Sequence, residues 1–99
     1  MAKVDMIAVI RDAIAATERL VMDKSIALTV RLPNQVAPVA GDKDRLIQVM
    51  VNLISNAVKF CDAGRGHIEV TLASEIDSLK VFVKDNGIGV GAPDQKLIF

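Results

Sequence analysis

Residues 42–60, with the sequence DKDRLIQVMVNLISNAVKF, restrict the possible folds of this chain more than any other stretch. When they are placed at about 100° intervals, the helical period, the apolar side chains cover roughly 200° of the circumference. A helix that packs on a single neighbour needs a narrower apolar stripe than this. We therefore expect a helix that is capped by Asp42 and packs against two elements at once.

The remaining arc of this predicted helix is polar and carries two asparagines one turn apart, Asn52 and Asn56, followed by Lys59. Asparagine is a poorer helix former than Glu, Lys or Arg by roughly 0.5 kcal/mol, and no carboxylate occurs between Arg45 and Phe60. Amide oxygens can ligate a hard metal ion, and a lysine can neutralise phosphate. The stripe fits a polyanion with a bound cation, although an ordinary solvated face that happens to carry amides explains the same residues.

Composition argues against several classes of function. The 99 residues suffice for one small domain, and 12 basic side chains balance 12 acidic ones, so no overall field favours nucleic acid or an anionic membrane. Three Phe and no Trp or Tyr offer little for base stacking. Cys61 is the single cysteine, which rules out an internal disulfide and fits a reducing compartment. No apolar run has the length of a membrane span. We expect a cytoplasmic domain with no nucleic-acid partner and no direct membrane contact.

A first helix is expected from an Asp5 cap to about Asp23, because apolar residues recur there at helical spacing. Its charged residues, among them Arg11 and Glu18, are left for water. The expected apolar stripe consists of Met6, Ile7, Val9, Ile10, Ala13, Ile14, Ala16, Leu20 and Val21.

Alternating apolar residues predict strands over 27–32, 67–73 and 79–84, and residues 36–40 predict a short edge segment limited by Pro38. The last two long strands are joined by five residues, which suits a hairpin. The two helices can then cover one face of a mostly antiparallel sheet. The expected fold class is α+β, a two-layer sandwich.

A glycine-rich segment, DNGIGVG, begins at Asp85 directly after the predicted hairpin. Glycines at alternate positions let the backbone turn sharply and let a ligand approach where a Cβ would block it. An Asn-Gly turn between strands is the alternative, but IGVGAPDQ does not alternate like a returning strand. The segment is neither a GxxxxGK[ST] phosphate loop nor a GxGxxG that opens a helix after a first strand.

The two motifs in this order, with a glycine loop and a hairpin between them, resemble the ATP-binding domain of sensor histidine kinases within the GHKL superfamily. Residues 42–60 look like the N box, residues 85–90 like the G1 box, and residues 97–99 like the start of the F box. The resemblance covers residues 1–99 as one partial domain. It implies a Bergerat-type ATP-binding fold, incomplete at its C-terminus.

The resemblance assigns ATP and magnesium as cofactors. Asn56 matches the asparagine that ligates magnesium, where a neutral oxygen suffices because the phosphates supply negative charge. Asn52 would support the metal and the phosphates, Lys59 would neutralise phosphate, and Phe60 would pack near the base. No catalytic residue is assigned to this stretch.

On the second motif, Asp85 matches the aspartate that accepts a hydrogen bond from the exocyclic amine of adenine and so selects adenine over guanine. Gly87 and Gly89 would leave room for the nucleotide. ATPases of the superfamily have a glutamate one turn before the metal asparagine as the base for the attacking water, whereas this chain has Asn52 there. An amide cannot accept that proton, which favours a kinase over ATP hydrolysis.

Several parts of the family pattern have no counterpart, namely the ATP lid, the GxGLGL-type G2 box, the closing strands and a helix with a phosphoacceptor histidine. The chain ends on the apolar run DQKLIF, which indicates truncation. His67 is the only histidine and is expected on a strand surface, and Cys61 is expected to be buried filler. We expect the fragment alone to bind ATP with magnesium weakly or not at all, to lack autokinase activity, and to self-associate through uncovered edges.

The predicted function is the ATP-binding part of a two-component histidine kinase. Such an enzyme transfers the γ-phosphoryl group of ATP to a histidine on a separate dimerisation domain and then onward to a response regulator. The alternative is a non-catalytic protein-interaction module built on a degenerate kinase fold.

Overall fold

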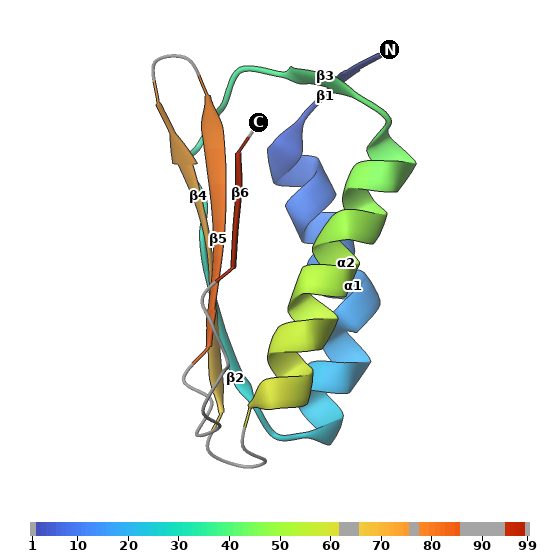
Figure 1. Cartoon of the computed structure of the whole chain (residues 1–99), viewed down its shortest axis with the longest axis vertical. Helices are drawn as coiled ribbons and strands as arrows, with labels where there is room; N and C mark the ends of the chain where they lie inside the picture. The colour runs from blue at the N-terminus through green and yellow to red at the C-terminus, as the bar shows by residue number, and fades with distance from the viewer. Residues whose placement is uncertain (1, 62–65, 76–77, 86–94, 99) are drawn as a thin grey trace.

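Two long helices form one layer of the molecule and a four-stranded sheet forms the other, as the computed structural model shows (Figure 1). The structure describes residues 2–61, 66–75, 78–85 and 95–98. The helices α1 (Met6–Asp23) and α2 (Lys43–Phe60) contact each other and cover one face of the sheet. The predicted α+β two-layer arrangement is confirmed.

The helix α1 begins and ends where local chemistry dictates. The Asp5 side chain accepts a hydrogen bond from the Ile7 N–H at 3.0 Å, which confirms the predicted cap. Beyond its last turn, Ser25 has a φ of 53° and its N–H donates to the Met22 carbonyl at 3.0 Å. The Ile26 N–H donates to the Val21 carbonyl at 3.1 Å, which completes a Schellman motif without the usual glycine.

The sheet contains β2 (Ala27–Arg31), β4 (His67–Ser74), β5 (Leu79–Asp85) and β6 (Gln95–Ile98), in the order β2-β4-β5-β6. The pairs β4–β5 and β5–β6 are antiparallel, whereas β2 runs parallel to β4. The helix α2 therefore lies in the connection between two parallel neighbours.

A separate two-stranded sheet pairs β1 (Ala2–Val4) with β3 (Val39–Gly41) in antiparallel fashion just before the two helices begin. The predicted segment 36–40 was wrong in its bounds, because the strand starts only after Pro38, which has no N–H to donate. Gly41 is the last residue of this strand. A Cβ there would meet Leu46 Cδ1 at 3.1 Å, so the close approach to α2 favours glycine.

The core lies between the helices and the inner face of the sheet. Ile68, Val70 and Leu72 of β4 alternate with half-buried residues, as the predicted period of two requires. The buried residues of the helices are Met6, Val9, Ile10, Ala13, Thr17 and Val21 of α1, and Met50, Ile54, Ala57 and Val58 of α2.

The predicted apolar stripe of α1 was wrong at one edge. Leu20 is 46% exposed and Ala16 is also exposed, whereas Thr17 is fully buried. The Thr17 hydroxyl donates to the Ala13 carbonyl at 2.9 Å, so its polar atom is satisfied inside its own helix and the side chain can face the core.

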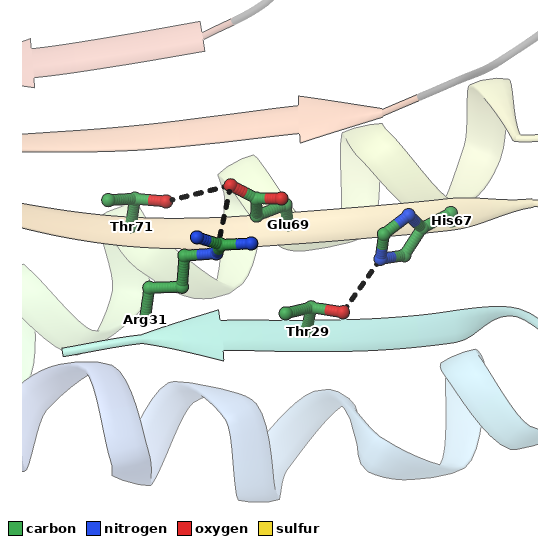
Figure 2. A network of polar contacts seen from close by, with 5 residues as sticks. All are labelled: Thr29, Arg31, His67, Glu69 and Thr71. Carbon is green, nitrogen blue, oxygen red and sulfur yellow. Dashed lines mark hydrogen bonds and ion pairs between the residues drawn. The ribbon is translucent and has the colours of Figure 1, made fainter.

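The outer face of the sheet carries a network of polar side chains, which Figure 2 shows. Thr29 Oγ1 and His67 Nε2 are 2.7 Å apart across the β2–β4 pair. Arg31 Nε lies 3.5 Å from Glu69 Oε1, and the Thr71 hydroxyl donates to the same oxygen at 3.3 Å. His67 was predicted to be a surface residue of a strand, but it is only half-exposed because it packs within this network.

Candidate functional site

The helix α2 presents most of the predicted site residues, and its ends follow from its sequence. The Asp42 carboxylate accepts hydrogen bonds from the N–H groups of Asp44 at 3.0 Å and Arg45 at 3.5 Å. This confirms the predicted cap. An acid, Asp44, in the first turn and a base, Lys59, in the last turn both match the helix dipole.

One face of α2 is buried and the opposite face is open. α2 contacts both α1 and β5, which confirms the packing on two sides that its wide apolar arc predicted. The apolar arc nevertheless reaches the surface at its margins, because Val49 is 39% and Phe60 is 47% exposed. The exposed polar stripe of α2 consists of Arg45, Gln48, Asn52, Asn56 and Lys59.

The two asparagines of the stripe are in different states. Gln48 Nε2 donates a hydrogen bond to Asn52 Oδ1 at 3.2 Å, across one turn. Within the described part of the chain, the Asn56 side chain makes no hydrogen bond, and it is exposed. The Asn56 amide oxygen is thus the better placed of the two to accept a cation.

The residues of the stripe fit magnesium only together with a ligand that brings its own oxygens. The stripe holds no carboxylate, and no cluster of three or more His, Cys, Asp or Glu side chains that could bind a metal occurs among the described residues. A hard cation takes oxygen ligands and usually keeps several waters or phosphate oxygens. One amide oxygen beside a lysine suits a metal that arrives with a polyphosphate.

The last turn of α2 carries Lys59 and Phe60, and its backbone is held by a residue that sequence reasoning missed. Lys24 Nζ donates to the Val58 carbonyl at 2.8 Å and to the Lys59 carbonyl at 3.2 Å. Lys24 follows α1 directly, so no local pattern in the sequence connects it with the end of a helix more than thirty residues away.

The second predicted motif begins at the same end of the fold. Asp85 is the last residue of β5 and pairs with Ile68, the second residue of β4, which follows α2 in the chain. The C-terminal ends of β5 and α2 therefore lie at the same end of the fold, near the bottom of the view in Figure 1. The Asp85 side chain, Gly87 and Gly89 lie outside the described residues.

A surface pocket of about 600 Å³ lies at the opposite end of the helices, where α1 and α2 begin. It is lined by residues 2–5, Ala8 and residues 41–43, and by none of the predicted nucleotide-binding residues.

Cys61, expected to be filler, is buried at 4% exposure directly after α2. No helix in the described ranges combines the length and apolar character needed to span a bilayer.

Residues 41–99 match the family model described as histidine kinase-, DNA gyrase B- and HSP90-like ATPase. An uncharacterised sensor-like histidine kinase of Rhizobium meliloti is 36% identical over 93 residues. That match covers 90% of this chain but only 18% of the relative.

Two solved histidine kinases share the fold. The catalytic domain of ThkA superposes with a TM-score of 0.81 at 22% identity, over 90% of this chain and 60% of that one, and ThkA has also been solved in complex with the response regulator TrrA. Full-length ShkA in complex with AMPPNP gives a TM-score of 0.77 at 26% identity, over 91% of this chain and 19% of that one.

Proposed function

This chain belongs to the family of histidine kinase-, DNA gyrase B- and HSP90-like ATPases, and we propose on that basis that it is the ATP-binding part of a sensor histidine kinase. One observation carries the proposal: an exposed amide and a lysine lie on the last two turns of α2, at the end of the fold where β5 leads into the second motif. The Rhizobium meliloti relative supports it, since its name is that of a sensor-like histidine kinase. The chain spans only 18% of that relative's length, so the whole reaction belongs to the proposal.

In the proposed site, Asn56 contributes its amide oxygen to magnesium, and Lys59 neutralises phosphate. Magnesium would supply charge neutralisation for the polyphosphate. Asn52, one turn back, supports the same group, and Phe60 offers an exposed ring at the end of the helix for contact with the base. The protein's role is then positioning and electrostatic stabilisation, as in phosphoryl transfer generally.

We assign the adenine contact to Asp85, whose carboxylate would accept a hydrogen bond from the exocyclic amine. Gly87 and Gly89 would admit the nucleotide close to the backbone. The complex of ShkA with AMPPNP supports a nucleotide ligand for this fold, and the ThkA–TrrA complex supports a response regulator as a partner. The further partner would be a domain that carries the phosphoacceptor histidine. We place the protein in the cytoplasm, where ATP is abundant and a lone buried cysteine stays reduced.

The amide of Asn52 favours phosphoryl transfer to a protein over hydrolysis of ATP. No base for an attacking water is available at Asn52, because an amide cannot accept the proton. Transfer to a histidine needs no such base on α2. A non-catalytic interaction module on the same fold is the second candidate, and it predicts no response to nucleotide.

Titration of the 99-residue chain with ATP and magnesium, followed by the backbone amide signals in NMR, tests the proposal. We expect weak binding, with shifts confined to residues 52–60 and 85–89. Asn56→Ala should reduce the magnesium-dependent part of the response, and Lys43→Met, at the other end of α2, should leave it unchanged. Of the two results expected for the isolated chain, weak binding and no binding, only weak binding supports the proposal. An unresponsive spectrum at millimolar ATP would therefore leave the interaction module as the preferred function. A low-micromolar dissociation constant would support ATP binding as the function and contradict only the prediction that the isolated chain binds ATP weakly.

A further inference from the structure

Lys24 connects the end of α1 with the end of α2. Its ammonium nitrogen donates to the Val58 carbonyl at 2.8 Å and to the Lys59 carbonyl at 3.2 Å, and the side chain is half-buried. The Val58 carbonyl also accepts from the Cys61 N–H at 3.2 Å, so Lys24 adds a charged donor to the last turn of α2. Donors in this position satisfy carbonyls that a helix leaves without an i+4 partner.

The position of Lys24 is fixed by the way α1 ends. Lys24 is the C-cap of α1, and the Schellman motif formed by Ser25 and Ile26 holds the chain immediately after it. Val21 and Ile26, whose backbones bond in this motif, are only 6% and 7% exposed, so the turn is anchored in the core. The ammonium group therefore reaches α2 from a rigid base.

The last turn of α2 is electrostatically unfavourable for an anion. Aligned peptide dipoles place a partial negative charge at a helix C-terminus, and the proposed site for a polyphosphate lies on the two final turns of α2. Lys59 adds a positive charge to this turn on an exposed side chain. The Lys24 ammonium lies on the carbonyls themselves and offsets the negative charge at its source.

We propose that Lys24 is a positioning residue that makes the C-terminal end of α2 compatible with a polyphosphate ligand. It holds the carbonyls of the turn that carries Lys59 and Phe60, and it cancels the negative end of the helix dipole. The inference rests on the proposed nucleotide site. It predicts that Lys24 matters for the charged part of the ligand and hardly at all for the neutral nucleoside.

The experiment compares ATP with magnesium and adenosine as ligands of the same chain, by NMR titration. Lys24→Met removes charge and donor, Lys24→Gln keeps a donor without charge, and Lys24→Arg keeps both. Lys43→Met is the matched control, because it removes a cation from the first residue of α2, roughly 22 Å from the turn that Lys24 contacts. The Lys43 ammonium pairs with Asp12 at 3.6 Å, but both side chains are half-exposed and such a pair contributes little to stability. Thermal unfolding and the amide spectrum establish that each variant is folded.

Lys24→Met and Lys24→Gln should raise the dissociation constant of ATP with magnesium by roughly three- to tenfold and that of adenosine by less than about twofold. Lys24→Arg and Lys43→Met should stay within about twofold of the unsubstituted chain for both ligands. If Lys24→Met does not fold, the Gln and Arg variants carry the comparison.

Four outcomes would overturn the inference. Equal weakening of both ligands would mean that Lys24 only maintains the structure. Equal effects of Lys43→Met and Lys24→Met would mean that the loss of one positive charge, wherever it lies, explains the weaker binding of ATP. No response of the unsubstituted chain to ATP would remove the proposed function and this inference with it, whereas a normal ATP response that is unaffected by Lys24→Met would remove the inference alone.

Discussion

Gln48 Nε2 donates a 3.2 Å hydrogen bond to Asn52 Oδ1, so that one of the two asparagines on the exposed stripe of α2 is already engaged and the other is not. The two asparagines have the same side-chain chemistry and different residues one turn before them. Asn52 has Gln48, whereas Asn56 has Asn52 itself. Because Asn52 accepts a hydrogen bond from Gln48 and Asn56 accepts none from Asn52, substitutions can separate the contributions of the two asparagines to ligand binding.

Gln48→Ala should strengthen binding of ATP with magnesium by roughly 1.5- to twofold, because an i,i+4 pair of this kind is worth about 0.2–0.5 kcal/mol and competes with the ligand for Asn52. Titration by NMR measures the change. Arg45→Ala, a turn nearer the N-terminus on the same stripe, is the control and should change nothing. Weaker binding after Gln48→Ala would show that Gln48 holds Asn52 in its productive orientation.

Asn56→Ala should weaken ATP binding by about tenfold with magnesium present and by much less in EDTA, since the lost group is a ligand of the metal. Asn52→Ala should produce a smaller and less metal-dependent loss. The measurement is the dissociation constant with and without the ion. Equal losses under both conditions would show that Asn56 contacts the nucleotide directly.

Asp85→Ala should weaken ATP by about tenfold and leave GTP unchanged, because the carboxylate is proposed to accept a hydrogen bond that only adenine donates. Competition between the two nucleotides for the same amide signals provides the ratio. Lys84→Ala, the preceding exposed residue of β5, serves as the control. An unchanged ratio of ATP to GTP affinity would exclude Asp85 from base recognition.

Ser25→Gly should stabilise the fold by about 0.5–1 kcal/mol, because the side chain at a φ of 53° strains the backbone and glycine removes this strain. The glycine variant loses more backbone entropy on folding, but this cost cancels only part of the gain. The midpoint of thermal unfolding should rise by about 3–6 °C. Ser25→Val should lower it, since a β-branched residue tolerates this conformation poorly. A lower midpoint for the glycine variant would show that the serine side chain stabilises the turn.

The two cross-strand contacts in Figure 2 should respond differently to salt. A double-mutant cycle on Thr29→Val and His67→Ala should give a coupling of about 1 kcal/mol at constant pH, unchanged in 1 M NaCl. A cycle on Arg31→Ala and Glu69→Gln should give about 0.5 kcal/mol, which falls towards zero in salt because the Arg31 side chain is 68% exposed. A Thr29–His67 coupling that falls in 1 M NaCl would contradict the predicted difference between the two contacts.

Much of the fold follows from periodicity in the sequence. The caps at Asp5 and Asp42, both helices and the hairpin of β4 and β5 were predicted to within two residues of their observed bounds. These elements are long, and each has an apolar face whose period identifies it. The strand β1 was not predicted, because three residues carry no period and the strand exists only through its pairing with residues 39–41.

The errors within the helices have a common physical origin, since a helical wheel locates a stripe but not the neighbour that covers it. Leu20 and Thr17 exchange their expected places at the edge of α1, and the intrahelical hydrogen bond of Thr17 makes its burial acceptable. Lys24 could not have been found from the sequence, because its partners are carbonyls, which every residue has.

In the candidate site, the stripe of α2 was predicted to be exposed and polar and is so. The assignment of Asp85, Gly87 and Gly89 stays a prediction.

The parallel pairing of β2 with β4 has a consequence for how a ligand would affect the whole chain. The helix α2 is the crossover between these strands, and Lys24 ties its final turn to the segment that leads into β2, so the ligand site and the strand pairing belong to one connected unit. A ligand bound there would favour the joined state by mass action. Nucleotide concentration would then govern how resistant the chain is to unfolding and to proteases.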